Sequence, residues 1–359
     1  MSGLENILAL NLENALQVIL LGFIGGVLSG FIGSGGAFFM TPGMMNLGVP
    51  GIIAVGSNIT HKFGKAMMGS KIHGELGHVD KKLGLFMLVT ALIGIRLAVW
   101  LNEAFFHLKE TEHGGSSGSA AGDLYISSIF VFVLSIVSIS ILRDALGTRE
   151  KGEGPSTKLA EFVSRIKIPP TITFKTADVN LSFWIIAAVG LVTGYLAGTI
   201  GVGGFIGVPA MIYVFGIPTA VAAGTELYLA MYMGAWGAIN YAWGGFVDIR
   251  LVFLLYCGSL TGIYIGAYGT KVVKERIIRL VTGIIILLCV ISRSINIPVY
   301  LHDLGFFSLS DNANIACNWL SKALLFTSGI SGVAVILYSV FRAYSRRRKV
   351  QELLREIGA

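Results

Sequence analysis

Charged residues are scarce in this chain. Of its 359 residues, 13% are charged and 54% are hydrophobic, and the mean hydropathy is +0.75. Soluble domains carry about 25% charged residues, so the composition excludes an ordinary soluble protein. Apolar runs long enough to cross a bilayer, about 20 residues, recur along the whole length. We therefore predict an all-α, multi-pass protein of the cell (inner) membrane.

Cysteine is also scarce. The three cysteines form no Cys-x-x-Cys pair, which excludes a disulfide scaffold or a cysteine zinc site. The turn from His73 to Asp80 contains histidines and carboxylates but no helical His-x-x-x-His, so we predict no metal site. Walker loops, Rossmann fingerprints and nucleophile elbows are missing. The sequence therefore indicates neither an enzyme nor a cofactor.

Basic residues are unevenly placed. The net charge is +7, and Lys and Arg collect between Arg143 and Asp178 and in the tail from Phe341 to Ala359. Basic residues gather in this way at a cytoplasmic membrane face, and nothing in the sequence suggests a fold that would present them to nucleic acid. The start, MSGLENILALNLENALQ, lacks the basic residues of a signal peptide. We therefore expect the first apolar helix to be retained, and the bilayer to be the main partner.

One stretch occurs twice. GFIGGVLSGFIGSGGAFFMTPGMMNLGVP, from Gly22 to Pro50, is matched by GLVTGYLAGTIGVGGFIGVPAMIYVFGIP, from Gly190 to Pro218. The offset is constant, since 190 − 22 and 218 − 50 both give 168. The match extends to the turns GHVD and GFVD, where we expect Asp80 and Asp248 to be helix N-caps. The sequence therefore predicts an internal two-fold repeat.

Each copy contains a helix that the sequence interrupts. A ridge with glycine at every fourth position, suited to close helix packing, is followed by a Gly-x-Gly-Gly break and a short apolar segment with one proline. Such a segment is too short to cross alone, and we expect two re-entrant half-helices, over 37–47 and 203–215. A duplicated broken helix is the best sequence pointer to the binding site of a transporter.

The organisation that follows has about nine membrane spans and two re-entrant segments. Five spans separate the two basic stretches, whereas an even number is required if both are cytoplasmic, so parallel and inverted repeats both stay open. The predicted divisions are a first repeat (1–145), a central polar loop (146–180), a second repeat (181–295), an extra loop with a ninth span (296–341) and a basic tail (342–359).

The breaks are candidate anion sites. A helix that begins inside the membrane presents unpaired N–H groups and about half a positive charge. Glycines let an oxyanion approach those N–H groups closely. We therefore predict that a small anion binds between the two breaks, at Gly33, Ser34, Gly35, Gly36, Gly201, Gly203 and Gly204.

The helix after the first break is unusually polar. Asn58, His61, Lys62 and Lys65 share one helical face, and Glu226 stands opposite Asn58 at the offset of 168. An ionisable group at mid-bilayer costs about 3 kcal/mol or more and should face protein or water. We predict that the anion site also includes Asn58, His61, Lys62, Thr225 and Glu226, with a purely structural ion pair as the alternative. Lys65, near the helix end, is expected to snorkel to the interface.

These motifs resemble those of the TauE/SafE family of membrane anion exporters. The similarity covers Gly22 to about Ala98 and Gly190 to about Thr270. The resemblance implies export of sulfite, sulfonates or related anions, and it leaves an oligomer open. A proton-coupled anion importer that uses Glu226 is a second hypothesis. A membrane-embedded sensor or scaffold, with the tail as its interaction module, is a third.

Overall fold

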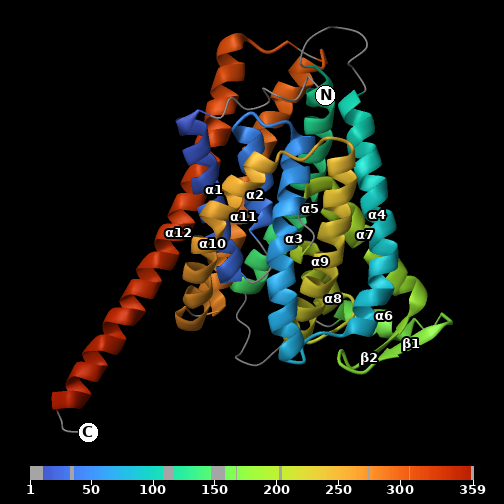
Figure 1. The fold of residues 1–359 in the computed structure, drawn as a ribbon, viewed down its shortest axis with the longest axis vertical. Coiled ribbons are helices and arrows are strands. Elements are labelled where there is room, and N and C mark those ends of the chain that lie inside the picture. The colour runs from blue at the N-terminus through green and yellow to red at the C-terminus, as the bar shows by residue number, and fades with distance from the viewer. Residues whose placement is uncertain are drawn as a thin grey trace.

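The computed structural model describes residues 11–32, 36–107, 117–146, 158–166, 168–201, 204–273, 275–306 and 308–356. Over these residues the chain is almost entirely helical (Figure 1), which agrees with the predicted fold class. The elements are α1 (Leu12–Ile32), α2 (Ala37–Asn46), α3 (Gly51–Glu75), α4 (Lys81–His107), α5 (Ser117–Leu146), α6 (Lys158–Arg165), β1 (Thr171–Phe174), β2 (Val179–Ser182), α7 (Phe183–Ile200), α8 (Gly204–Tyr213), α9 (Thr219–Trp243), α10 (Ile249–Val272), α11 (Glu275–Asp303) and α12 (Asp311–Glu356).

Seven of the described helices are long and apolar enough to cross a membrane, which confirms a multi-pass membrane protein. They are α1, α4, α5, α7, α10, α11 and α12. The predicted count of nine also includes α3 and α9, which have 25 residues each. Polar residues such as Lys62 and Glu226 keep these two helices outside that set. The length of each, roughly 37 Å at the α-helical rise, still matches a bilayer.

The two short helices fold back on the helices that precede them. In the first hairpin, Gly36 packs on Gly25 and Gly43 on Leu21, so α2 runs antiparallel to α1. In the second, α7 begins after β2, and α8 ends at Tyr213. Gly216, just beyond that end, lies beside Ala160 of α6, on the same side of the molecule. Both hairpins therefore return to the face from which they enter (Figure 1).

The hairpin geometry bears on the number of membrane passages between the two basic stretches, which the sequence leaves open as odd or even. In Figure 1 the segment with α6, β1 and β2 and the far end of α12 lie at the lower face. Because α7 and α8 together make no net crossing, α9, α10, α11 and α12 separate the two basic stretches, and an even number of passages joins them. The lower face is hereafter the basic face.

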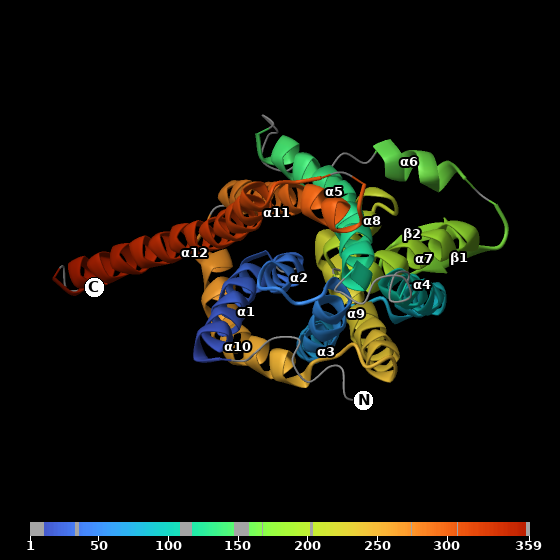
Figure 2. The same ribbon diagram turned by 90° about the horizontal axis from the view of Figure 1, so that it is seen from above.

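The glycine ridges allow helices from different halves of the chain to touch. Along α1, Gly22 and Gly26 pack directly on the α10 backbone at Leu255 and Ser259. Along α7, Gly190 and Gly194 pack in the same way on α4. The close-packing role predicted for both ridges is confirmed. The ranges 1–145 and 181–295 are therefore segments of sequence rather than separate bodies, because α1 packs on α10 and α4 on α7 (Figure 2).

At the centre, α3 and α9 lie side by side and run in opposite directions. Gly56 of α3 meets Phe246, just past the end of α9, whereas Gly69 meets Leu227 near its start. The turns that follow them are capped as predicted. Asp80 Oδ1 accepts a hydrogen bond from the Leu83 N–H at 2.9 Å, and Asp248 accepts one from the Arg250 N–H.

The structure departs from the expected elements in three places. The central polar segment contains a β-hairpin in which β1 and β2 pair antiparallel. Helix α11 continues past the predicted end at Ile295 to Asp303, with Pro298 inside it. The predicted ninth span and basic tail form one continuous helix, α12, whose far end projects from the bundle (Figures 1 and 2). At the last two sites the polar residues suggest a loop and a tail, whereas the structure continues the helix through them.

The glycine ridges lead to a stability prediction. A Cβ atom at Gly26 would lie 2.5 Å from the Ser259 carbonyl oxygen, and backbone cannot move away cheaply. We expect Gly26→Ala to destabilise the protein by about 1–3 kcal/mol, as overpacking does. Gly74→Ala is the matched control because a Cβ there meets nothing within 4 Å. The measurement is the apparent melting temperature in detergent, which should fall for Gly26→Ala only; equal values would contradict the packing role.

Candidate functional site

A cavity of about 300 Å³ lies between the two half-chains. Five helices supply its walls: α1, α3, α8, α9 and α10. Most of its surface is apolar, and its charged side chains are Lys62 and Lys65 of α3 and Glu226 of α9. The exposed residues of its rim include Met68 and Ile72, in the last turns of α3 before that helix ends at Glu75.

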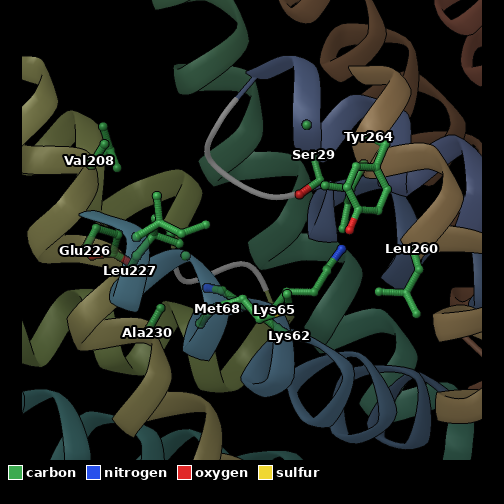
Figure 3. A pocket seen from close by; sticks show the side chains of 17 residues that line it. Ser29, Lys62, Lys65, Met68, Val208, Glu226, Leu227, Ala230, Leu260 and Tyr264 are labelled. Carbon is green, nitrogen blue, oxygen red and sulfur yellow. The ribbon is translucent and has the colours of Figure 1, made fainter. Parts of the chain in front are cut away.

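The two lysines point to different parts of this cavity. Figure 3 shows one ammonium group directed toward the wall that carries Glu226, and the other toward Ser29 and Tyr264. Lys62 is the charged group that acts electrostatically on Glu226, and Lys65 acts on His61 beside α10. Lys65 was expected to snorkel to the interface. The structure instead places it in the lining, one turn from Lys62.

Glu226 is almost fully enclosed, with 1% of its surface exposed. Its carboxylate lies against α8, where only a glycine at position 207 leaves room for it: a Cβ atom there would overlap the carboxylate. Neither carboxylate oxygen has a hydrogen-bond partner among the described residues. A buried carboxylate without hydrogen-bond partners is costly, so a nearby cation or a bound proton would stabilise Glu226.

Asn58, which stands opposite Glu226 in the repeat, ties the first half-helix in place. Its Nδ2 donates hydrogen bonds to the Ala37 carbonyl at 3.0 Å and to Thr41 Oγ1 at 2.8 Å. Thr41 in turn donates to the Ile200 carbonyl at 3.1 Å, at the end of α7. Gly201 follows with φ of 74°, a left-handed conformation suited to glycine, and lies against Thr41 and Asn58. This polar contact joins the end of α7 to the first half-helix.

Two of the predicted site residues, His61 and Thr225, form contacts away from the cavity. His61 Nε2 lies 2.8 Å from Ser259 Oγ, and its ring stacks at a tilt on Tyr256. Thr225 Oγ1 accepts a hydrogen bond from the Asp80 N–H at 3.0 Å. Asn58, His61 and Thr225 are buried and do not line the cavity, whereas Lys62, Gly204 and Glu226 do.

The glycine breaks are only partly within the described residues. Gly33, Ser34, Gly35 and Gly203 lie outside them. Gly36 is described, and it packs so tightly on the Gly25 carbonyl that a Cβ atom would overlap it. Gly204 opens α8 and lines the cavity, so the N-terminal end of that half-helix borders it. Such an end favours negative charge.

Comparison with known proteins agrees with this architecture. The profile of the sulfite exporter TauE/SafE family matches residues 18–293. The chain belongs to this family. The matched part contains both hairpins and the cavity, and it extends through most of α11.

Two relatives from Bacillus subtilis (strain 168) are similar over most of this region. The probable membrane transporter protein YdhB is 24% identical over 237 residues, covering 64% of this chain and 80% of that protein. The probable membrane transporter protein YjnA is 25% identical over 250 residues, covering 68% and 86%. No solved structure matches the chain. The chain is therefore a membrane transporter of the TauE/SafE family.

The sequence missed Ser29 and Tyr264 as members of the cavity lining. Tyr264 lies on α10, far along the chain from α3, and nothing in its local pattern marks it. Ser29 precedes Gly30 in the glycine ridge, and a polar residue at that position of an apolar helix was the available signal. Both place hydroxyl groups near the lysine ammonium that faces away from Glu226 (Figure 3).

Proposed function

We propose that this protein exports small oxyanions, with sulfite and organosulfonates as the expected substrates. The observation that carries the proposal is the cavity with Lys62, Lys65 and Glu226 in an otherwise apolar setting. With all three ionised, the site holds one net positive charge, which a monoanion neutralises. Ammonium groups at low dielectric attract an anion far more strongly than they do in water, and the start of α8 adds its partial positive charge.

Alternating access between inverted repeats is the proposed transport mechanism. The helix pairs α2/α8, α3/α9 and α4/α10 begin at positions 167 or 168 residues apart. The members of each pair run in opposite directions in Figure 1, as inverted repeats require. Because α1 packs on α10 and α7 on α4, we propose that the rocking units combine helices of both repeats. The hydrogen bond from Thr41 to the Ile200 carbonyl lies where these units meet.

The position of the cavity rim, near the basic face, favours export over import. Its rim at Met68 and Ile72 lies near the basic face, which the positive-inside rule assigns to the cytoplasm. The described helix ends at that face carry cations: Lys71 near the end of α3, Lys81 and Lys82 at the start of α4, and Arg276 and Arg279 at the start of α11. A cytoplasmic anion would therefore find the site open to it. Each negative charge that leaves gains about 2.3 kcal/mol at 100 mV, inside negative, so export needs no coupling ion.

A proton-coupled importer is the second candidate. It is favoured by the oxygens of Glu226, which have no hydrogen-bond partner in the part of the chain that the structure describes. In that case protonation of Glu226 would accompany entry of the anion. Flux driven by an imposed pH gradient without an anion gradient would identify the importer. A sensor or scaffold predicts no flux, with function lost on removal of 346–359.

The deciding experiment is a current screen with purified protein on a solid-supported membrane. Sulfite, sulfate, thiosulfate, methanesulfonate and small carboxylates are applied one at a time, with protein-free liposomes as the control. We expect charge-moving currents with sulfite and methanesulfonate that saturate with concentration. The absence of current for every sulfur oxyanion would end the proposal.

A further inference from the structure

Two adjoining shallow surface depressions lie between α4 and α9, toward the side of the molecule opposite the basic face. One, of about 460 Å³, is polar and includes Arg96, Glu103, His107 and Asn240. The other, of about 520 Å³, is apolar and includes Leu92 and Trp100. Arg96 and Trp236 line both, so the two form one continuous hollow.

This hollow occupies the same positions in the repeat as the cavity that holds Lys62. Leu92 and Leu260 differ by 168 in number, and so do Arg96 and Tyr264; the first of each pair lines the hollow and the second the Lys62 cavity. On the other wall, Trp236 and Asn240 line the hollow, and their counterparts Met68 and Ile72 line the Lys62 cavity. Four matched positions on two helices make the two spaces counterparts.

Because the two repeats run in opposite directions, the two spaces lie toward opposite sides of the molecule. Because α3 runs antiparallel to α9, positions that approach the basic face in one repeat approach the far face in the other. Alternating access between inverted repeats requires one opening on each side, formed by equivalent residues. We propose that the α4–α9 hollow is the outward vestibule of the transport path and that Arg96 is its anion-binding residue. This rests on the proposed function.

Arg96 is suited to that role. It is an exposed arginine within a membrane-spanning helix, and its Nη1 donates one hydrogen bond, to Asn240 Oδ1 at 3.3 Å. Charged groups at such depth are expensive unless they meet a counter-charge. A guanidinium group binds oxyanions through paired N–H groups. Glu103 in the same wall repels an anion, so binding stays weak enough for release.

The vestibule predicts a side-specific defect. Methanesulfonate flux is measured in right-side-out and inside-out vesicles for wild type, Arg96→Gln, Arg96→Lys and the control Arg250→Gln, whose arginine is on the same face but bound to Asp248. We expect Arg96→Gln to raise the KM for external anion about tenfold, as for loss of a hydrogen bond to a charged group, with the cytoplasmic KM within about twofold. Arg96→Lys should recover most of the affinity. Equal changes on both sides, or none, would overturn the proposal.

A binding readout separates this inference from the proposed function. Ile239→Cys, in a background with Cys257, Cys289 and Cys317 replaced by serine, places a thiol in the polar depression. External methanesulfonate should slow its reaction with an impermeant maleimide, and Arg96→Gln should remove that protection. Protection without flux keeps the vestibule and removes the transport proposal. Flux without protection removes the vestibule, and a protection that requires anionic lipid assigns Arg96 to a lipid headgroup instead.

Discussion

Lys62→Met is expected to reduce anion flux on the order of 100-fold with no loss of folded protein. Methionine keeps most of the length of lysine and removes its charge, so the cavity would lose the cation that faces Glu226. An uncompensated charge at this depth is worth about 3 kcal/mol, and each 1.4 kcal/mol is about tenfold in an equilibrium constant. The measurement is the initial current at equal protein density and at a sulfite concentration well below the wild-type KM, where the current follows the affinity of the site.

Lys71→Met is the matched control for that variant. Lys71 lies on the same helix, and its side chain is exposed and does not line the cavity. It should therefore transport like wild type, and Lys62→Arg should keep partial activity because the charge is retained. If Lys62→Met and Lys71→Met gave the same current, the cavity would not be the substrate site. A Lys62→Met protein that elutes as an aggregate would instead indicate a structural ion pair.

Much of the helical architecture could be predicted because local patterns dictate it. Long apolar runs determine membrane spans, and glycines at every fourth position determine close packing, as Gly22 and Gly26 on α10 confirm. Proline within a short apolar segment, as in α2 and α8, marked the half-helices. Asp80 and Asp248 were identified as caps because capping depends on neighbouring residues only.

The composition of the site could be predicted only in part. Charge identified Lys62 and Glu226, since burial of an ionisable group in lipid demands a reason. Which side chains line the cavity depends on helix rotation and on packing between distant segments, and local sequence does not encode either. Thr225 therefore bonds to the Asp80 backbone rather than lining the cavity, and Tyr264 joins the lining from α10. The even number of crossings also required the knowledge that α7 and α8 form one hairpin.

Glu226→Gln is expected to separate net export from exchange. In the empty site Glu226 is the internal counter-charge for the lysines, and in the loaded site the anion also supplies negative charge. Glutamine has nearly the same shape but no charge, so the empty transporter would have to change conformation with two unpaired cations. At about 3 kcal/mol for that charge, net efflux should fall on the order of 100-fold, whereas exchange of internal for external anion should stay within about threefold.

The comparison requires vesicles loaded with labelled methanesulfonate, diluted into buffer either with or without external methanesulfonate. Exchange that is preserved while net efflux is lost would support a counter-charge that permits the empty site to return. Loss of both processes alike would mean that Glu226 is needed for anion binding or for folding. Loss of neither would show that the charge of Glu226 has no role in transport. If Glu226 carries a proton in an importer instead, Glu226→Gln abolishes uptake driven by a pH gradient. The two roles differ because a counter-charge must stay ionised throughout the cycle, whereas a proton carrier must change its charge once in each cycle.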